Sequence, residues 1–316
     1  MSGHVLLDKA WAAYKDFKSP TIILIGIIMV TNMDWTKLQV SDAEMEEAYE
    51  HVGGLKRSWM KKHIAYLSCM YGLDTSLEVS WSRSFRAGYI SRRLSGPFPE
   101  LFVFADNSHR AWNLLTAAVI PAIASGVGNI YVFLVSGRQK TCAEILTCLE
   151  LSGVESIYLL EKSAAVSMIK EFVKSKEIFP VIDMCAASPY KEVRPESPCR
   201  RENYTRLVLG PEPQGLIWSE EDSTWDYEII KWAHPDTRFT VAGPGASRAS
   251  AHFDTAKKDS RELLARHYDI FLGPWDIFRS SSIAQGFAPG MEPFWLWPNL
   301  DKKCFAVNRV FWEEIQ

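Results

Sequence analysis

Short apolar runs alternate with helical segments between Leu101 and Tyr190, and this alternation constrains the fold more than any other feature of the chain. Four runs have the composition of buried strands, at 101–104, 130–135, 157–160 and 181–184. Three segments with helical apolar spacing lie between them, at 112–124, 141–152 and 164–174. Strands joined in this way by helices predict a parallel sheet with right-handed crossovers. The fold class expected is therefore α/β, with doubly wound parallel sheets.

The turn Ala105–His109 follows the first of these strands, at the end of a parallel sheet where ligands usually bind. One interpretation assigns Asp106, Asn107 and Ser108 to cofactor binding, with the Asp106 carboxylate accepting from a ribose hydroxyl. The alternative is a plain turn in which Asn107 or Ser108 caps the next helix. The turn has no glycine to let its backbone approach a pyrophosphate.

Several segments of the middle region resemble the cofactor lobe of histidinol dehydrogenase and of the wider aldehyde dehydrogenase superfamily. Residues 115–127, LTAAVIPAIASGV, resemble a helix that ends at a Gly-Val corner before a strand. Residues 143–158, AEILTCLELSGVESIY, resemble the later helix that ends in Leu-(Ala/Ser)-Gly-Val. Residues 183–189, DMCAASP, stand where aldehyde dehydrogenases carry Glu-Leu-Gly-Gly-Lys-Ser-Pro, and only the acid and Ser-Pro are kept.

The resemblance continues toward the C-terminus and covers residues 98–275 in all. Residues 227–237, YEIIKWAHPDT, resemble the segment that leads into the Ala-Pro-Glu-His-Leu motif of histidinol dehydrogenase, and residues 268–273, YDIFLG, resemble its later strand. The acid/base Glu-His pair of that family aligns with Asp236 and Thr237, so its histidine is missing unless His234 replaces it. The zinc-binding segment has no recognisable counterpart at 195–206, so we expect no metal site and no tightly bound zinc.

The resemblance implies two lobes. The superfamily inserts its cofactor lobe into its substrate lobe, so we expect a Rossmann-like cofactor lobe at 98–199 and a discontinuous substrate lobe from 1–97 and 200–285. Strands of these two flanks should then share one sheet. The tail 280–316 is rich in Trp, Phe and Pro and is expected to wrap the body or to contact a partner.

The first hundred residues predict further α/β elements. We expect a strand at 22–30 and helices at 6–17, 42–51 and 55–70, with Ser41 or Asp42 capping the helix that starts at 42.

Three further residues are candidates for chemistry. Cys185 ends the fourth strand, where a thiolate could act as a nucleophile, although a buried inert thiol is the favoured interpretation. His234 and Asp236 are two residues apart and could form an acid/base pair, although a structural His-Pro-Asp turn is more common. The loop 243–248, GPGASR, could hold an anion or be a structural turn, and the turn is favoured.

Composition limits the partners. The net charge of −3 gives no indication of nucleic-acid binding, and the apolar run at 22–30 is too short for a membrane helix. The six cysteines have neither zinc-site spacing nor a disulfide pattern, which favours a reducing cytoplasm.

The sequence therefore supports two functional hypotheses. The first is a divergent oxidoreductase that uses NAD or NADP and acts on a small alcohol or aldehyde between two lobes. The second is a non-catalytic relative that serves as a binding or assembly subunit, as a homodimer or with a partner protein, through its aromatic C-terminal tail.

Overall fold

The computed structural model describes residues 37–72, 79–136, 141–175, 180–193, 203–256 and 260–314. The helix expected at 6–17 and the strand expected at 22–30 lie outside these residues. Among the described helices, none is long and apolar enough to cross a bilayer.

The first sheet has five parallel strands in the order β5-β4-β3-β6-β7. Their bounds are β3 Glu100–Asp106, β4 Asn129–Ser136, β5 Ser156–Glu161, β6 Pro180–Met184 and β7 Asn203–Arg206. Side chains alternate between its two faces, so Leu101 and Val103 belong to one apolar cluster while Phe102 and Phe104 belong to another. All four strands predicted from the sequence are confirmed, and β7 is an addition.

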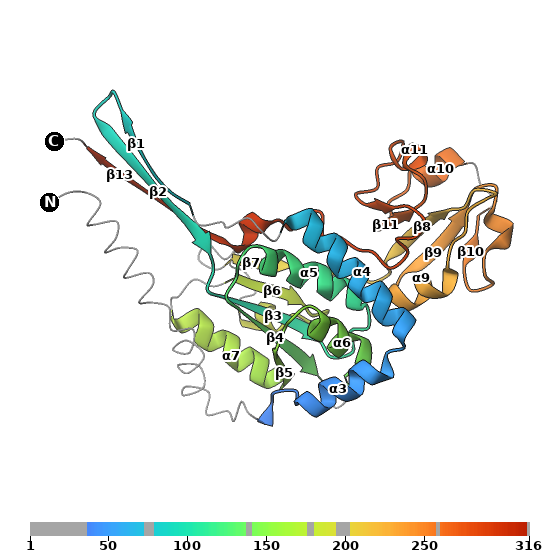
Figure 1. Cartoon of the computed structure of the whole chain (residues 1–316), viewed down its shortest axis with the longest axis horizontal. Coiled ribbons are helices and arrows are strands. Elements are labelled where there is room, and N and C mark those ends of the chain that lie inside the picture. Colours follow the sequence, from blue (N-terminus) through green and yellow to red (C-terminus); the bar gives the residue numbers. More distant parts are fainter. Residues whose placement is uncertain are drawn as a thin grey trace.

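Helices cover both faces of this sheet (Figure 1). One face carries α5 Trp112–Ala124 and α6 Ala143–Leu151, and the other carries α7 Lys162–Ser175, which is followed along the chain by the short α8 Pro189–Val193. The N-terminal helices α3 Asp42–His51 and α4 Gly54–Tyr71 form an outer layer on α6 and α5. Ser41 caps α3 through a reciprocal capping box with Glu44, as one of the two predicted caps. We call the first sheet and these helices the first lobe.

The second sheet also has five parallel strands, in the order β10-β9-β8-β11-β12. Their bounds are β8 Gln214–Trp218, β9 Arg238–Ala242, β10 Asp254–Thr255, β11 Ile270–Leu272 and β12 Gly286–Phe287. Apolar side chains of α9 Tyr227–Ala233 pack on one face of the sheet, and those of α10 Ser260–Leu264 and α11 Trp275–Phe278 pack on the other. We call this unit the second lobe.

The aromatic tail returns from the second lobe across the first. Trp297 donates from Nε1 to the carbonyl of Leu114 at 3.0 Å, and Tyr71 donates to the carbonyl of Leu300 at 3.0 Å. Phe287, Phe294, Trp295 and Trp297 are buried. The expectation that the tail wraps the body is confirmed for these residues.

A three-stranded antiparallel sheet, which we call the arm, projects from the body (Figure 1). It consists of β1 Val79–Phe85, β2 Tyr89–Pro97 and β13 Ala306–Glu314, in that order, and the short 3-10 helix η3 Lys302–Phe305 leads into β13. The sequence did not predict the arm.

The arm corrects one expectation. Strands before residue 98 were expected to join the sheet of the 200–285 flank. Instead β1 pairs with β2 and β2 pairs with β13, and the second sheet takes its described strands from residues 214–287. Residues 42–71 likewise pack on the first lobe, because the apolar side chains of α3 and α4 meet those of α5 and α6. For the predicted strand at 22–30, which is not described, membership of the second lobe stays a prediction.

Candidate functional site

The first sheet changes winding direction between β3 and β6. From β3 the chain moves outward to β4 and β5, and it then crosses back to β6 and β7 on the other side. Loops leaving two neighbouring strands in opposite directions open a crevice at their carboxyl ends, which is where open α/β sheets bind ligands. Asp106 ends β3 at this point, and its Oδ2 accepts a 2.7 Å hydrogen bond from the backbone N–H of Ala186 after β6.

A cavity of about 520 Å³ lies at this crevice, between the two lobes. Its volume is in the range of small-molecule sites. The first lobe contributes Asp106, His109 and Arg206, and the second contributes His234 and Asp236. Trp295 and Trp297 of the tail and the connecting segment 207–211 complete the lining. Polar groups from distant parts of the chain therefore line one space between the lobes.

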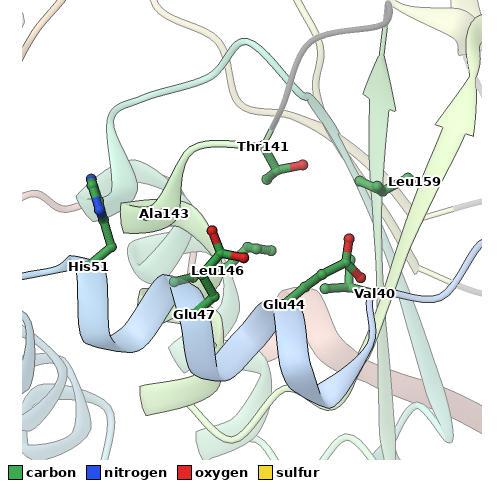
Figure 2. Close-up of a pocket in the computed structure, with 9 residues that line it drawn as sticks. Val40, Glu44, Glu47, His51, Thr141, Ala143, Leu146 and Leu159 are labelled. Atoms are coloured by element: carbon green, nitrogen blue, oxygen red, sulfur yellow. The ribbon is translucent and has the colours of Figure 1, made fainter.

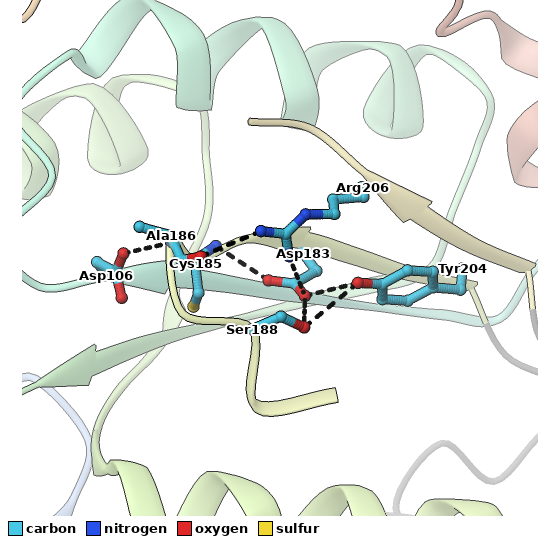
Figure 3. A network of polar contacts seen from close by, with 7 residues as sticks. All are labelled: Asp106, Asp183, Cys185, Ala186, Ser188, Tyr204 and Arg206. Atoms are coloured by element: carbon cyan, nitrogen blue, oxygen red, sulfur yellow. Dashed lines mark hydrogen bonds and ion pairs between the residues drawn. The ribbon is translucent and has the colours of Figure 1, made fainter. Parts of the chain in front are cut away.

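A buried carboxylate fixes the wall of the cavity on the side of β6 (Figure 3). Asp183 is fully buried, and its Oδ1 accepts from the N–H of Cys185 at 2.9 Å. Its Oδ2 accepts from Tyr204 at 2.7 Å, from Arg206 at 3.2 Å and from the hydroxyl of Ser188. Arg206 also donates to the carbonyl of Ala186 at 3.1 Å. The acid and the serine that the family resemblance singled out are thus bonded to each other.

His234 lies at this cavity, but both of its ring nitrogens are used. Nδ1 lies 3.3 Å from Nδ2 of Asn113, and Nε2 lies 3.0 Å from the carbonyl oxygen of Glu292. An amide nitrogen donates and a carbonyl accepts, so Nδ1 is the acceptor and Nε2 carries the hydrogen. Burial lowers the pKa of His234 to about 4, so the ring is neutral.

The other predicted chemical residues divide between the cavity and the core. Asp236 lines the cavity and is exposed to solvent. Cys185 is buried, as the favoured interpretation expected. Burial raises the pKa of its thiol, which disfavours the nucleophilic thiolate.

The three predicted cofactor residues are also separated. Asp106 lines the cavity, whereas Asn107 is buried and accepts from the Thr141 hydroxyl at 2.7 Å, and Ser108 is exposed outside the lining. The backbone N–H of Asn107 donates to the carbonyl of Val135, and the backbone N–H of His109 donates to the carbonyl of Asp106. Two backbone N–H groups of the turn are therefore hydrogen-bonded within the protein and are not available to a phosphate.

His109 and Arg206 line the cavity and were not among the site residues predicted from the sequence. His109 lies in the turn after β3, and its Nε2 is buried with no hydrogen-bond partner among the described residues. A histidine in a polar turn has no periodic neighbours that would indicate burial, so the sequence contained no signal for it.

The glycine-rich loop 243–248 has a structural explanation. A Cβ at Gly243, whose φ is +95°, would lie 2.6 Å from the carbonyl oxygen of Ser219, and one at Gly245 would lie 2.2 Å from that of Glu220. Arg248 donates to the carbonyl of Glu221. These contacts support the favoured interpretation of a turn.

A second hollow, of about 330 Å³, lies beside α3 (Figure 2). Glu44, Glu47 and His51 line it, but Glu44 already accepts from the N–H and hydroxyl of Ser41 at 2.9 and 2.7 Å. Within the described parts of the chain, no three or more His, Cys, Asp or Glu side chains are grouped to hold a metal ion.

Comparison with known proteins identifies the fold. No protein-family model and no curated protein matches the chain. The structure of histidinol dehydrogenase from Elizabethkingia anophelis aligns with a TM-score of 0.57 and 10% identity, over 98% of this chain and 84% of that one. The two proteins therefore share a fold with two parallel sheets, as the resemblance implied.

Two further structures align more weakly. Betaine aldehyde dehydrogenase from Staphylococcus aureus gives a TM-score of 0.46 at 8% identity, covering 82% of this chain and 76% of that one. An NAD-dependent benzaldehyde dehydrogenase from Corynebacterium glutamicum gives 0.40 at 10% identity, covering 87% and 91%.

Proposed function

We propose that the chain is an NAD(P)-dependent oxidoreductase that acts on a small alcohol or aldehyde held between its lobes. The observation that carries the proposal is the cavity at the switch point between β3 and β6, which residues of both lobes line. The fold shared with histidinol dehydrogenase supports the same class of reaction. We also propose a cytoplasmic site of action, because the cysteine pattern is that of a reducing compartment.

Asp106 is the residue that best fits a dinucleotide. A carboxylate offers about four acceptor sites, so Asp106 can accept from a ribose hydroxyl as well as from Ala186. Asp106 stands at the carboxyl end of β3, beside the switch point, where open α/β sheets bind their ligands. A bound nicotinamide would supply the hydride acceptor or donor that the side chains lack.

The substrate would lie on the side of the cavity that the second lobe lines. Asp236 is the carboxylate that this lobe presents to the space, and Trp295 and Trp297 contribute apolar surface to its lining. His234 supports the wall as a neutral ring bonded on both sides, and Cys185 contributes packing. We therefore assign positioning to His234 and no nucleophilic role to Cys185.

Calorimetric titration with NAD+, NADH, NADP+ and NADPH tests the proposal. We expect one nucleotide per chain and a preference for NAD(H), because the 2′-phosphate of NADP(H) would meet the Asp106 carboxylate. Asp106→Ala should weaken NAD(H) binding by about 1–3 kcal/mol, or roughly five- to 150-fold, and should weaken NADP(H) less. Asp106→Asn, which keeps an acceptor oxygen, should lose less than Asp106→Ala.

A wild-type chain that gives no heat with any of the four nucleotides at millimolar concentration would refute this function. In that case the non-catalytic hypothesis would be preferred.

The arm favours an assembly role as a second candidate, and this role can coexist with catalysis. Val310, Phe311 and Trp312 of β13 are 57%, 59% and 58% exposed, and β13 is an edge strand of the described sheet. Long, apolar, open edges invite pairing with another strand. Arg309 and Glu313 flank Phe311 symmetrically, so antiparallel pairing about Phe311 would set each Arg309 opposite the Glu313 of a second copy.

We therefore propose a homodimer through β13. Light scattering should give twice the chain mass for the wild type, and Phe311→Glu should give the monomer mass. Trp275→Glu is the matched control, because Trp275 is 68% exposed on α11, away from the arm. A wild-type chain that stays monomeric at every concentration would contradict the dimer.

A further inference from the structure

A third hollow, of about 350 Å³, lies where the lobes meet, beside the interlobe cavity. Arg110 and Pro235 line it, while their chain neighbours His109 and Asp236 line the cavity. Consecutive residues of both lobes thus face two different spaces. We call this space the α6–α9 hollow, because the start of α6 and one face of α9 complete its lining, with Cys142, Glu144, Glu228, Lys231 and Trp232.

The carboxylate of Glu144 in this lining is already used within the protein. Its Oε1 accepts from Nε1 of Trp232 at 3.1 Å and lies 3.5 Å from Nζ of Lys56, and its Oε2 accepts from the thiol of Cys142 at 2.9 Å. The Lys56 ammonium also lies over the Trp232 ring, 5.0 Å from its centroid. Glu144 and Lys56 therefore neutralise each other and fix the wall where α9 meets α6.

The remaining charges of the lining are Arg110, Lys231 and Glu228, all of them exposed. Arg110 comes from the first lobe and Lys231 from the second. Neither side chain has a hydrogen bond or an ion pair with another residue of the described chain. Glu228 lies about one turn before Lys231 on α9, and no ion pair joins the two. The lining therefore keeps a net positive charge, which two unpaired cations provide.

The neighbouring cavity has the opposite balance. Arg206 is the cation of its described lining, and that guanidinium is paired with Asp183 at 3.2 Å. Asp106 and Asp236 add carboxylates to the same lining. An anionic group that binds between the lobes is therefore favoured in the hollow and disfavoured in the cavity.

We propose that the α6–α9 hollow binds a phosphate group through Arg110 and Lys231. A guanidinium donates to two phosphate oxygens at once, and an ammonium acts as a point charge toward a third. A phosphate held in this way links the two lobes beside the cavity. The group can belong to a free phosphate or phosphate ester, or to the pyrophosphate of a dinucleotide. The site does not depend on the proposed function, because it concerns different side chains.

Calorimetric titration of the full chain with inorganic pyrophosphate, at low salt and without divalent metal, tests the site. We expect one pyrophosphate per chain and weaker binding as salt is added. Arg110→Gln and Lys231→Gln should each weaken binding about threefold to tenfold. Glu228→Gln removes the opposing charge and should tighten binding about twofold to fivefold. Lys170→Gln is the matched control, because Lys170 is exposed on α7, on the far face of the first sheet, and it should behave as the wild type.

A second titration identifies the source of the phosphate. Pyrophosphate is titrated into the chain in the presence of saturating NADH. If the heat of pyrophosphate binding disappears and Arg110→Gln also weakens NADH, the hollow holds the pyrophosphate of the dinucleotide. If pyrophosphate binds as it does without NADH, the hollow takes a separate phosphate or phosphate ester. Either result supports the site.

The proposal is overturned if millimolar pyrophosphate gives no heat, or if Arg110→Gln and Lys231→Gln both bind it as tightly as the wild type. A loss in Lys170→Gln as large as theirs, or no gain in Glu228→Gln, would also contradict it. Failure of all four nucleotides to bind refutes the proposed function and leaves this site standing, because pyrophosphate binding is measured without a nucleotide.

Discussion

At the scale of residues, two neutral histidines are buried where the lobes meet. His63 is fully buried on α4 between the rings of Trp112 and Phe294, and neither of its nitrogens has a hydrogen-bond partner in the described residues. Asn113 links this region to the second lobe, because its amide nitrogen approaches His234 and donates to the carbonyl of Pro293 at 2.9 Å. The junction of the lobes therefore depends on histidines that stay uncharged.

This burial predicts acid lability. Burial lowers the pKa of His63 to about 3 and that of His234 to about 4, against an ordinary value of 6.5. Below pH 6.5 the two histidines bind protons in the unfolded chain but stay neutral in the folded chain. The free energy of unfolding therefore falls as the pH is lowered toward 4. The slope should approach about 1.4 kcal/mol per pH unit for each histidine.

Urea unfolding at a series of pH values measures this slope. His63→Leu should reduce the slope of the unfolding free energy against pH by about 1.4 kcal/mol per pH unit, the contribution of one histidine. His252→Gln, an exposed control, should leave the slope unchanged. Equal slopes in the wild type and His63→Leu would contradict the assignment.

Sequence reasoning was most reliable for residues whose role is local. Ser41 as a cap and Cys185 as a buried thiol follow from their neighbours in the chain. The engagement of both His234 nitrogens depends on Asn113 and Glu292, which lie far away in sequence, and the unpartnered nitrogen of His109 likewise depends on the fold.

At the scale of elements, the helices and buried strands of the first lobe were predictable, because their apolar periodicity is imposed by one sheet with two covered faces. The arm was not. β1, with the sequence VSWSRSF, alternates apolar residues with serines except at Arg83, and this strand pattern was not used, while β2 pairs with β13 across more than two hundred residues of chain. Such long-range pairing leaves no local trace in the sequence.

Asp183 connects three elements, namely β6, the loop that follows it and β7. Asp183→Ala would leave the Arg206 guanidinium beside a buried gap and would remove the acceptor of Tyr204 and Ser188. We expect a loss of about 3–5 kcal/mol in the free energy of unfolding. Asp276→Ala, which breaks an exposed pair with Arg279, should cost less than about 1 kcal/mol.

Chemical denaturation of the wild type and of both variants measures these losses in the free energy of unfolding. A loss for Asp183→Ala as small as that for Asp276→Ala would show that the buried network does not hold the cavity wall.

At the scale of the whole molecule, the two-lobe architecture was expected from the resemblance, and the way the chain builds it was not. The tail returns from the second lobe over α4 and α5 and ends in the arm, so its tryptophans contribute to the cavity. The expected sharing of a sheet between the flanks failed for β1 and β2, because they pair with each other and β2 pairs with β13. Composition reveals that a tail is aromatic but does not reveal which surface it covers.

The central claim is that a nucleotide-dependent ligand site lies between the lobes at the switch point of the first sheet. Hydrogen–deuterium exchange of the full chain with and without millimolar NADH tests it most directly. We predict slower exchange in segments of both lobes, namely 105–111, 184–188, 206–211 and 234–237, with no change at 243–248. Protection confined to one lobe, or none at all, would contradict the account.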